Sequence, residues 1–332
     1  MLDIIVTHYK EPWEIGKKFF DMLGCQQAID FRQIHVHLIH DGTECFPYEY
    51  FSLYPYKVRQ HRIEHGGVSA ARNYGIEISK SKWIAFCDFD DMFSNCFALK
   101  TVLDLMDTDD FDMLWMDFWG MDRKKDGSWK VIQKGENVVF IHGRFFLRDY
   151  LIQSGIRFNT GMEFNEDRLF VSTLTEMIPK ERIGHINTNF PGYVWCFTPN
   201  SATSTMENWW RGAIGGYQGN KQVVEMFKKI RPERYQIMLA RMVWDTYYSM
   251  NMEEIPEGLA SYLEDFRQFY RENKIDFWTT DPEQMNAARE AAWKQCSIME
   301  QEAVERWGVL PCHRREGVNI KTWLDGLETG VF

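Results

Sequence analysis

Residues 83–91 read Trp-Ile-Ala-Phe-Cys-Asp-Phe-Asp-Asp, an apolar run followed at once by a group of carboxylates. Carboxylates this close repel one another unless water, a counter-charge or a bound cation offsets the cost. The apolar run is typical of a fully buried strand in the middle of a parallel sheet. The acidic residues therefore follow the carboxyl end of a predicted central strand, the edge at which open α/β sheets bind ligands.

Two other Asp-x-Asp triplets lie nearby, at 107–109 and 110–112. Both fall between a predicted helix over 96–106 and a predicted strand over 113–116, where acidic residues are ordinary in turns and helix caps. Because the chain has 48 acidic residues, such triplets arise by chance. We therefore interpret these two as structural.

Strand-like and helix-like segments alternate on both sides of the acidic stretch, which predicts an α/β fold. Upstream, the patterns predict strands over 4–6, 34–39 and 56–63 and helices over 13–24 and 70–79. Downstream, they predict a hairpin around Gly127, a strand over 138–141, a helix over 144–154 and another over 168–177. From about residue 206 the composition changes to long helix-like segments rich in Trp, Met, Glu and Arg.

Composition excludes several classes of protein. The chain has 332 residues, 45% of them hydrophobic, which suits one domain with an appendage or two domains. A net charge of -10 argues against nucleic-acid binding. Seven cysteines without a Cys-x-x-Cys spacing predict a reduced, cytoplasmic protein. We expect no signal peptide and no transmembrane anchor, so any membrane contact would be peripheral.

Five segments in this order resemble the family 2 glycosyltransferases of the GT-A fold. They are Ile4–Glu11, Ile39–Thr43, Gly66–Gly75, Trp83–Asp91 and Asn165–Phe170. The resemblance implies a GT-A glycosyltransferase domain over residues 1–205, with a Rossmann-like mixed sheet flanked by helices. It leaves an α-helical C-terminal region over 206–332, which could shape the acceptor site or form a homo-oligomer contact.

The resemblance also implies where a sugar-nucleotide donor binds. A nucleotide diphosphate leaves readily only if its developing charge is neutralised, as a divalent cation held by carboxylates can do. Asp90 and Asp88 are thereby implied as ligands of Mn²⁺ or Mg²⁺, with Asp88 also binding the donor. The other donor-binding residues implied, for a UDP-sugar, are Thr7, Tyr9, Glu11, Asp41 and Arg72.

The Glu-Asp pair at 166–167 matches the segment in which the family carries its general base. The resemblance assigns Asp167 as the base that deprotonates an acceptor hydroxyl, with Glu166 orienting the acceptor. It further implies an inverting, single-displacement transfer of a hexose or N-acetylhexosamine. Without the upstream segments, a Glu-Asp pair at a helix start would be explained by the helix dipole alone.

Some positions depart from the family pattern. His8 stands where Thr is more usual after the first strand, and His65 stands where Asn usually precedes Gly-Gly. The stretch 193–201 lacks the basic residue and the metal-binding His often found there, which leaves His185 as a weak candidate for a third metal ligand. His35 and His37 share one strand face as a zinc pair would, but without a third ligand nearby we interpret them as sheet packing.

Two other functions fit parts of the sequence. A nucleotidyltransferase also combines an α/β sheet with metal-binding carboxylates, but 7–17 lacks the Gly-rich basic loop that a triphosphate needs. A non-catalytic sugar-nucleotide-binding module would keep the fold without turnover. If the chain is an enzyme, its sequence does not distinguish among four classes of acceptor: a glycan, a lipid-linked sugar, a protein and a small molecule.

Overall fold

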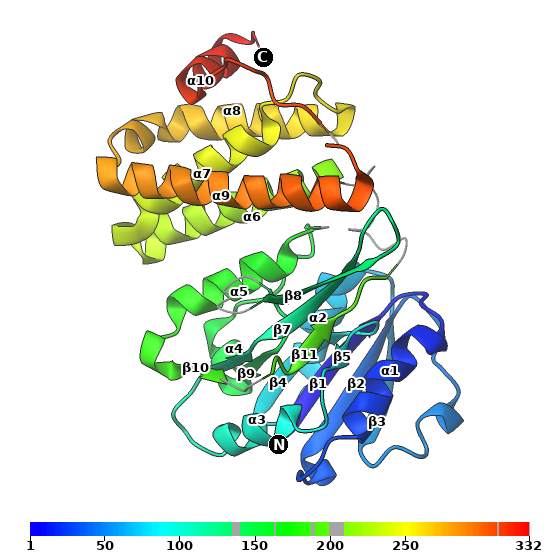
Figure 1. Ribbon diagram of the computed structural model, residues 1–332. Coiled ribbons are helices and arrows are strands. Elements are labelled where there is room, and N and C mark those ends of the chain that lie inside the picture. Colours follow the sequence, from blue (N-terminus) through cyan, green and yellow to red (C-terminus); the bar gives the residue numbers. More distant parts are fainter. Residues whose placement is uncertain (135–139, 163, 187–189, 199–208, 311, 332) are drawn as a thin grey trace. The chain divides into compact units, whose positions relative to one another are not determined.

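The computed structural model describes the chain except residues 135–139, 163, 187–189, 199–208, 311 and 332 (Figure 1). The chain divides into two compact units, which are described separately below. The first comprises Met1–Arg123 and Trp129–Thr198, and the second comprises Lys124–Ser128 and Pro199–Phe332. The predicted domain boundary at residue 205 lies outside the described residues.

The first unit is built on a mixed sheet of seven strands in the order β10-β6-β9-β4-β1-β2-β3. β4 lies at its centre, with β1 parallel to it on one side and β9 antiparallel on the other. β2 and β3 continue the parallel half beyond β1. The strands are β1 Leu2–His8, β2 Ile34–Asp41, β3 Lys57–Ile63, β4 Trp83–Asp88, β6 Met113–Met116, β9 Arg144–Leu147 and β10 Ile183–Ile186.

Both faces of this sheet are buried, which explains the continuous apolar run of β4. Trp83, Ala85 and Cys87 enter one apolar cluster, and Ile84 and Phe86 enter another on the opposite face. The flanking helices are α1 Trp13–Gly24, α2 Gly67–Ile78, α3 Ala98–Met106, α4 Arg148–Ser154 and α5 Glu166–Met177. The GT-A type of architecture expected from the sequence, a mixed sheet flanked by helices, is confirmed.

A smaller sheet of four strands completes the first unit, in the order β5-β11-β7-β8. Its strands are β5 Met92–Phe93, β7 Phe118–Arg123, β8 Trp129–Lys134 and β11 Tyr193–Trp195. β7 and β8 form the predicted antiparallel hairpin, with Gly127 at a φ of 82° in the turn between them. β5 follows the acidic stretch directly, so this sheet continues from the carboxyl end of β4.

The predicted helix over 144–154 is wrong in its first half. Arg144–Leu147 is strand β9, which pairs with both β4 and β6, and only Arg148–Ser154 is helical. Phe145 and Phe146 enter opposite apolar clusters, so a strand buried on both faces gave the same short apolar run as a helix. Gly155 ends α4 in a left-handed conformation.

The predicted strand over 138–141 lies partly outside the described residues, and its described part, Phe140–Ile141, is not in a strand. The predicted helix over 70–79 begins three residues earlier than expected, at Gly67.

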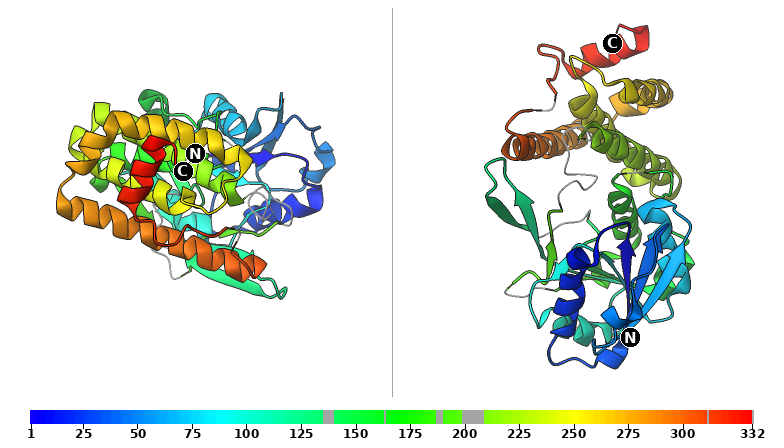
Figure 2. Two further views of the ribbon diagram at one scale, coloured as in Figure 1. Left: turned by 90° about the horizontal axis from the view of Figure 1, so that it is seen from above. Right: turned by 90° about the vertical axis from the view of Figure 1, so that its right-hand side faces the viewer.

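The second unit is helical, as the sequence predicted. Its helices are α6 Trp209–Ile230, α7 Pro232–Met250, α8 Glu257–Trp278, α9 Pro282–Trp307 and α10 Ile320–Thr329. α7 lies side by side with α6 and with α9 (Figure 2). Trp323, Leu239 and Phe266 are among the buried residues of its own apolar cluster. Among the described helices, none combines the length and the apolar character needed to cross a membrane.

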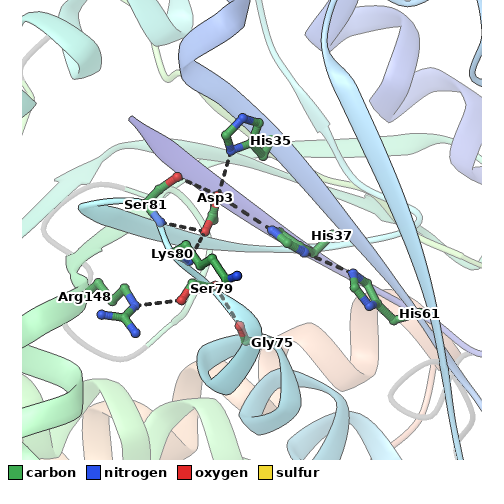
Figure 3. Close-up of polar contacts among 9 residues, drawn as sticks. All are labelled: Asp3, His35, His37, His61, Gly75, Ser79, Lys80, Ser81 and Arg148. Atoms are coloured by element: carbon green, nitrogen blue, oxygen red, sulfur yellow. Dashed lines mark hydrogen bonds and ion pairs between the residues drawn. The ribbon is translucent and has the colours of Figure 1, made fainter.

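A buried carboxylate fastens the N-terminal ends of the central strands (Figure 3). Asp3 accepts hydrogen bonds from the backbone N–H groups of Lys80 and Ser81, at 2.7 and 2.9 Å, and from the Ser81 hydroxyl at 2.6 Å. His35 Nδ1 lies 3.3 Å from the same carboxylate, and His37 Nδ1 lies 3.1 Å from His61 Nε2. His35 and His37 are therefore engaged in sheet packing, as we interpreted them.

Asp3 should stabilise the fold in a pH-dependent way. Burial raises the pKa of Asp3, but hydrogen bonds from His37, Ser81 and Lys80 outweigh it and hold this pKa well below its usual range. A lowered folded-state pKa contributes stability at neutral pH that is lost as the pH falls below the unfolded pKa of about 4. We expect Asp3→Asn to lower the free energy of unfolding by about 2–4 kcal/mol at pH 7.

Urea unfolding of the wild type and Asp3→Asn at several pH values measures this effect. The difference between their free energies of unfolding should become smaller in acid. Asp109→Asn is the control, because Asp109 is an exposed carboxylate that forms an ion pair with Lys82. Equal stability of the two variants at pH 7 would contradict the role given to Asp3.

Candidate active site

The residues predicted to bind a donor gather at one edge of the large sheet. In the register of the parallel strands, Thr7 of β1 lies opposite both Asp88 of β4 and Ile39 of β2. Tyr9 and Asp41 follow within two residues of these positions along the chain. The carboxyl ends of β1, β2 and β4 therefore bring together segments that the sequence separates by up to eighty residues.

Arg72 of α2 joins this edge to the start of α5. Arg72 is 3% exposed, and its guanidinium donates to two carboxylates, to Asp88 Oδ1 at 2.8 Å and to Glu166 Oε1 at 2.7 Å. The first partner ends β4 and the second begins α5. One buried cation thus brings the predicted metal-binding segment and the predicted base segment into one site.

Asp88 is a carboxylate whose charge is well compensated. Burial raises its pKa, but Arg72, His142 and a hydrogen bond from Thr7 outweigh burial and hold the pKa of Asp88 below its ordinary value. Asp88 is therefore ionised at neutral pH and has a fixed orientation.

Asp91 is entirely buried and anchors the segment around β11. It accepts hydrogen bonds from the Tyr193 hydroxyl at 2.9 Å and from the Cys196 backbone N–H at 2.8 Å. His142 Nδ1 lies 3.4 Å from its Oδ2. Burial lowers the pKa of His142, but the charge of Asp91 outweighs burial and raises it. At Asp91, burial outweighs His142 and raises the pKa of the carboxyl.

Asp90 differs from Asp88 and Asp91 because it has no basic side chain beside it among the described residues. Its Oδ2 accepts a hydrogen bond of 2.5 Å from the Thr198 hydroxyl, and no ion pair joins it to a basic side chain within the described part of the chain. Burial raises the pKa of Asp90 to about 7, and Asp91 and Asp88 add to the effect. A carboxylate in this state fits a site for a divalent cation, since a metal would supply the missing positive charge.

The acidic stretch also contributes to a potential metal-binding group, which does not include Asp90. Asp88, Asp91 and His142 each place one possible ligand atom within 4.8 Å of the others. Sequence reasoning selected Asp88 and Asp90 and missed both Asp91 and His142. His142 lies in the loop before β9, far from any recognised motif, and only the fold brings it to the acidic stretch.

The Glu-Asp pair opens α5, after Asn165 in a left-handed conformation with a φ of 60°. Glu166 is 8% exposed and bound to Arg72, and burial raises its pKa to about 7, with Asp167 adding to the effect. Asp167 is more exposed than Glu166 and accepts the backbone N–H of Arg168 at 2.7 Å. Of the two carboxylates, Asp167 is the more accessible to a substrate.

The aromatic part of the edge is formed by Tyr9 and His65. Their rings stack with centroids 4.5 Å apart, and Tyr9 is 39% exposed. Glu11 Oε2 accepts the Tyr9 backbone N–H at 2.8 Å, which holds the turn after β1. This exposed stacked pair is the part of the edge best suited to contact a planar ring.

Asp41 holds the turn that leads into α2. Its carboxylate accepts the backbone N–H groups of Gly66 and Gly67, at 2.8 and 2.9 Å, and lies 2.8 Å from His65 Nδ1. Gly67 has a φ of 82°, which residues with a side chain rarely adopt. Asp41 is 3% exposed, so its main contacts are with this turn.

Other predicted features lie elsewhere. His185 Nε2 lies 3.0 Å from Asp117 Oδ1, with its ring stacked on Trp115, and it is not part of the potential metal-binding group in the described residues. The stretch 193–201 is described only to Thr198. The two other Asp-x-Asp triplets are structural, since Asp109 pairs with Lys82 and Asp112 with Arg182.

Comparisons with known proteins identify the family and support the fold. The model of the family "Glycosyl transferase family 2" matches residues 3–168. The minor teichoic acid biosynthesis protein GgaA of Bacillus subtilis (strain 168) is 30% identical over 207 residues, covering 56% of this chain and 45% of that protein. GgaB of the same organism is 23% identical over 253 residues, covering 70% of this chain and 27% of that protein. The chain thus spans less than half the length of these relatives.

Among solved structures, the mannosyltransferase PcManGT from Pyrobaculum calidifontis, in complex with GDP-Man and Mn²⁺, is similar to this chain with a TM-score of 0.52. The sequences are 13% identical, and the match covers 89% of this chain and 86% of that one. This likeness supports the same fold.

The uncompensated charge of Asp90 should make the metal-free protein less stable in alkali. Its folded-state pKa is raised to about 7, so the folded state holds a proton that the unfolded chain releases near pH 4. The stability of the wild type should therefore fall as the pH rises from about 4 to about 7. In chelator at about pH 8 we expect Asp90→Asn to be more stable by roughly 1–2 kcal/mol, allowing for solvent screening.

Thermal or urea unfolding of both proteins in chelator at several pH values checks this expectation. Asp104→Asn serves as the control, since Asp104 is an exposed residue of α3 paired with Lys100. A wild type more stable than Asp90→Asn in alkali would show that Asp90 is already compensated.

Proposed function

The chain belongs to glycosyl transferase family 2, whose model matches half of it, and from this premise we propose the reaction that it catalyses. It is a glycosyltransferase that moves a hexose or an N-acetylhexosamine from a UDP-sugar to an acceptor hydroxyl, with inversion. The observation that carries the proposal is the buried guanidinium of Arg72, which binds Asp88 and Glu166 at once. It joins a donor-binding and a base segment in one site.

For the donor, the proposal assigns Asp88 and Asp90 to the diphosphate end and the turn after β1 to the nucleoside. Bound at Asp90, Mn²⁺ or Mg²⁺ would neutralise the negative charge that develops on the departing diphosphate. Arg72 keeps Asp88 ionised and oriented for this purpose. Tyr9 offers an exposed ring on which the nucleobase can stack, and Thr7 and Glu11 lie in the same segment of the chain.

Asp41 acts on the donor chiefly through the turn that it holds. Its carboxylate already accepts two backbone N–H groups and positions His65, the ring on which Tyr9 stacks. The nucleobase is therefore recognised by a surface that Asp41 fixes, with a remaining lone pair of Asp41 available to an imide N–H.

For the transfer step, Asp167 is the general base that accepts the proton of the attacking hydroxyl. Glu166 is less suited to this task because Arg72 holds it in an ion pair. We assign Glu166 the role of orienting either the acceptor or the Asp167 side chain. One base acting in a single displacement inverts the configuration at the anomeric carbon.

The acceptor is proposed from the relatives. GgaA and GgaB are named as minor teichoic acid biosynthesis proteins, so we assign this chain an acceptor from the same kind of pathway, presented in the cytoplasm. The helical region over 206–332 would shape the acceptor site or a contact between subunits.

Nucleotide release from UDP-, GDP-, CMP- and TDP-sugars, with Mn²⁺ or Mg²⁺ and with chelator, tests the proposal. Metal-dependent release of UDP from one donor supports it and identifies the sugar. UDP binding without release, even with teichoic acid polymers present, would indicate a non-catalytic binding module.

Asp167→Asn should separate donor binding from transfer. The amide keeps the size of the side chain but cannot accept a proton, so we expect transfer to fall by about 10²–10⁴-fold with donor affinity unchanged. Asp90→Ala should instead lose metal-dependent donor binding. Rates measured by UDP release and affinities measured by calorimetry distinguish the two effects.

Asp149→Asn is the matched control, because Asp149 lies in the first turn of α4 as Asp167 does in α5, and it is well exposed. Full transfer by Asp167→Asn would refute the assignment of the base.

A further inference from the structure

Two buried histidines face each other at the carboxyl ends of β1 and β2. His8 and His40 lie opposite one another in the parallel register and are 4% and 0% exposed. Their Nδ1 atoms are 2.9 Å apart, a hydrogen-bond distance. His8 immediately precedes Tyr9, and His40 immediately precedes Asp41, so the pair borders the proposed donor pocket.

The second nitrogen of His40 must carry a hydrogen. His40 Nε2 lies 2.9 Å from Gln60 Oε1. The orientation of the Gln60 amide is fixed, because its Oε1 accepts the Phe46 N–H at 2.8 Å and its nitrogen donates to the Phe46 carbonyl at 2.9 Å. Oε1 is an acceptor only, so His40 Nε2 is the donor.

The second nitrogen of His8 must also carry a hydrogen. His8 Nε2 lies 2.8 Å from the carbonyl oxygen of Glu11, which can only accept. Turning over either imidazole would place carbon atoms against Gln60 Oε1 or Glu11 O and lose these bonds. Both rings therefore have Nε2–H as a fixed donor.

A neutral imidazole has one N–H, and each ring has already used it. Two neutral rings would direct lone pairs at each other across 2.9 Å, which is repulsive. We infer that His8 and His40 share one additional proton between their Nδ1 atoms, and that this singly charged pair positions the turn that carries Tyr9 and Glu11.

The surroundings of the pair place this charge mainly on His8. The Glu11 carboxylate lies 3.9 Å from His8 Nε2, whereas His61 on β3 disfavours a charge on His40. Burial lowers the pKa of His40 to about 4, and His8 adds to this effect. The Thr43 hydroxyl lies 3.2 Å from His8 Nδ1, and the rings of Phe46 and Phe89 cover His8. His8 is the donor of the shared proton and His40 its acceptor.

The charged pair is a positioning device for the turn after β1. His8 holds the Glu11 carbonyl, and the Glu11 carboxylate holds the Tyr9 N–H. If the shared proton leaves at high pH, the facing lone pairs repel, so His8 shifts together with the turn that it holds through the Glu11 carbonyl. The link to donor affinity rests on the proposed function, whereas the shared proton does not.

Nitrogen NMR of the full chain labelled at histidine tests the shared proton directly. Near pH 6.5 we expect His8 and His40 to show Nε2–H on both rings and one further proton between the Nδ1 atoms, protected from exchange. His313→Asn, which removes an exposed imidazole, should leave these signals unchanged. Unprotonated Nδ1 atoms on both rings near pH 6.5 would overturn the inference, whatever the chain binds.

Calorimetric binding of UDP in saturating Mg²⁺, from about pH 6.5 to about 8.5, tests the positioning role. We expect the UDP affinity of the wild type to fall about tenfold as the shared proton is lost, because the charged hydrogen bond between the two Nδ1 atoms, which fixes His8 and through it the turn, disappears. In His8→Asn the side-chain amide can donate to His40 Nδ1 without an additional proton. His8→Asn should bind UDP more weakly than the wild type, and its UDP affinity should lack the additional pH dependence of the wild type.

The titration of UDP itself is common to both proteins and cancels in the comparison. Parallel pH profiles for the wild type and His8→Asn would refute the positioning role while leaving the shared proton to the NMR result. If the wild type bound no UDP at any pH, the donor assignment and the positioning role would both be wrong. The NMR experiment would still show whether His8 and His40 share a proton.

Discussion

The site depends on one buried guanidinium. Arg72 binds carboxylates that end β4 and begin α5, and its partner Glu166 lies 94 residues away in the sequence. Removing one partner of such a buried pair leaves an uncompensated charge, which typically costs about 3–5 kcal/mol. The start of α5, and with it the position of Asp167, is therefore fixed by the same contact that keeps Asp88 ionised.

The neighbouring carboxylates are compensated in different ways, and the difference separates their roles. Asp88 has Arg72, and Asp91 has His142 together with two hydrogen bonds from the segment around β11. Within the described residues, Asp90 has the Thr198 hydroxyl and no basic partner. A chain with a net charge of -10 thus places a buried basic side chain beside Asp88 and another beside Asp91, and leaves Asp90 for a ligand to neutralise.

Much of this arrangement could be predicted from the sequence, because it depends on local patterns. The apolar run of β4 ends in acids, and parallel strands place their carboxyl ends at one edge, which is where the structure has Thr7 opposite Asp88. Arg72 and Glu166 belong to segments that resemble a known family. The helix over 144–154 was mispredicted because a strand buried on both faces has no polar alternation to distinguish it from a buried helix.

The remaining contacts could not be predicted, because they join single residues through the tertiary fold. His142 has no motif around it, and its imidazole matters only because β9 runs antiparallel between β4 and β6. In the sequence, His8 was only a departure from the family pattern and His40 an ordinary strand residue. The protonation of the His8–His40 pair depends on the orientation of the Gln60 amide, which only the fold shows. Protonation is a property of the whole hydrogen-bond network, so the sequence supplies the imidazoles while the fold determines how many protons they hold.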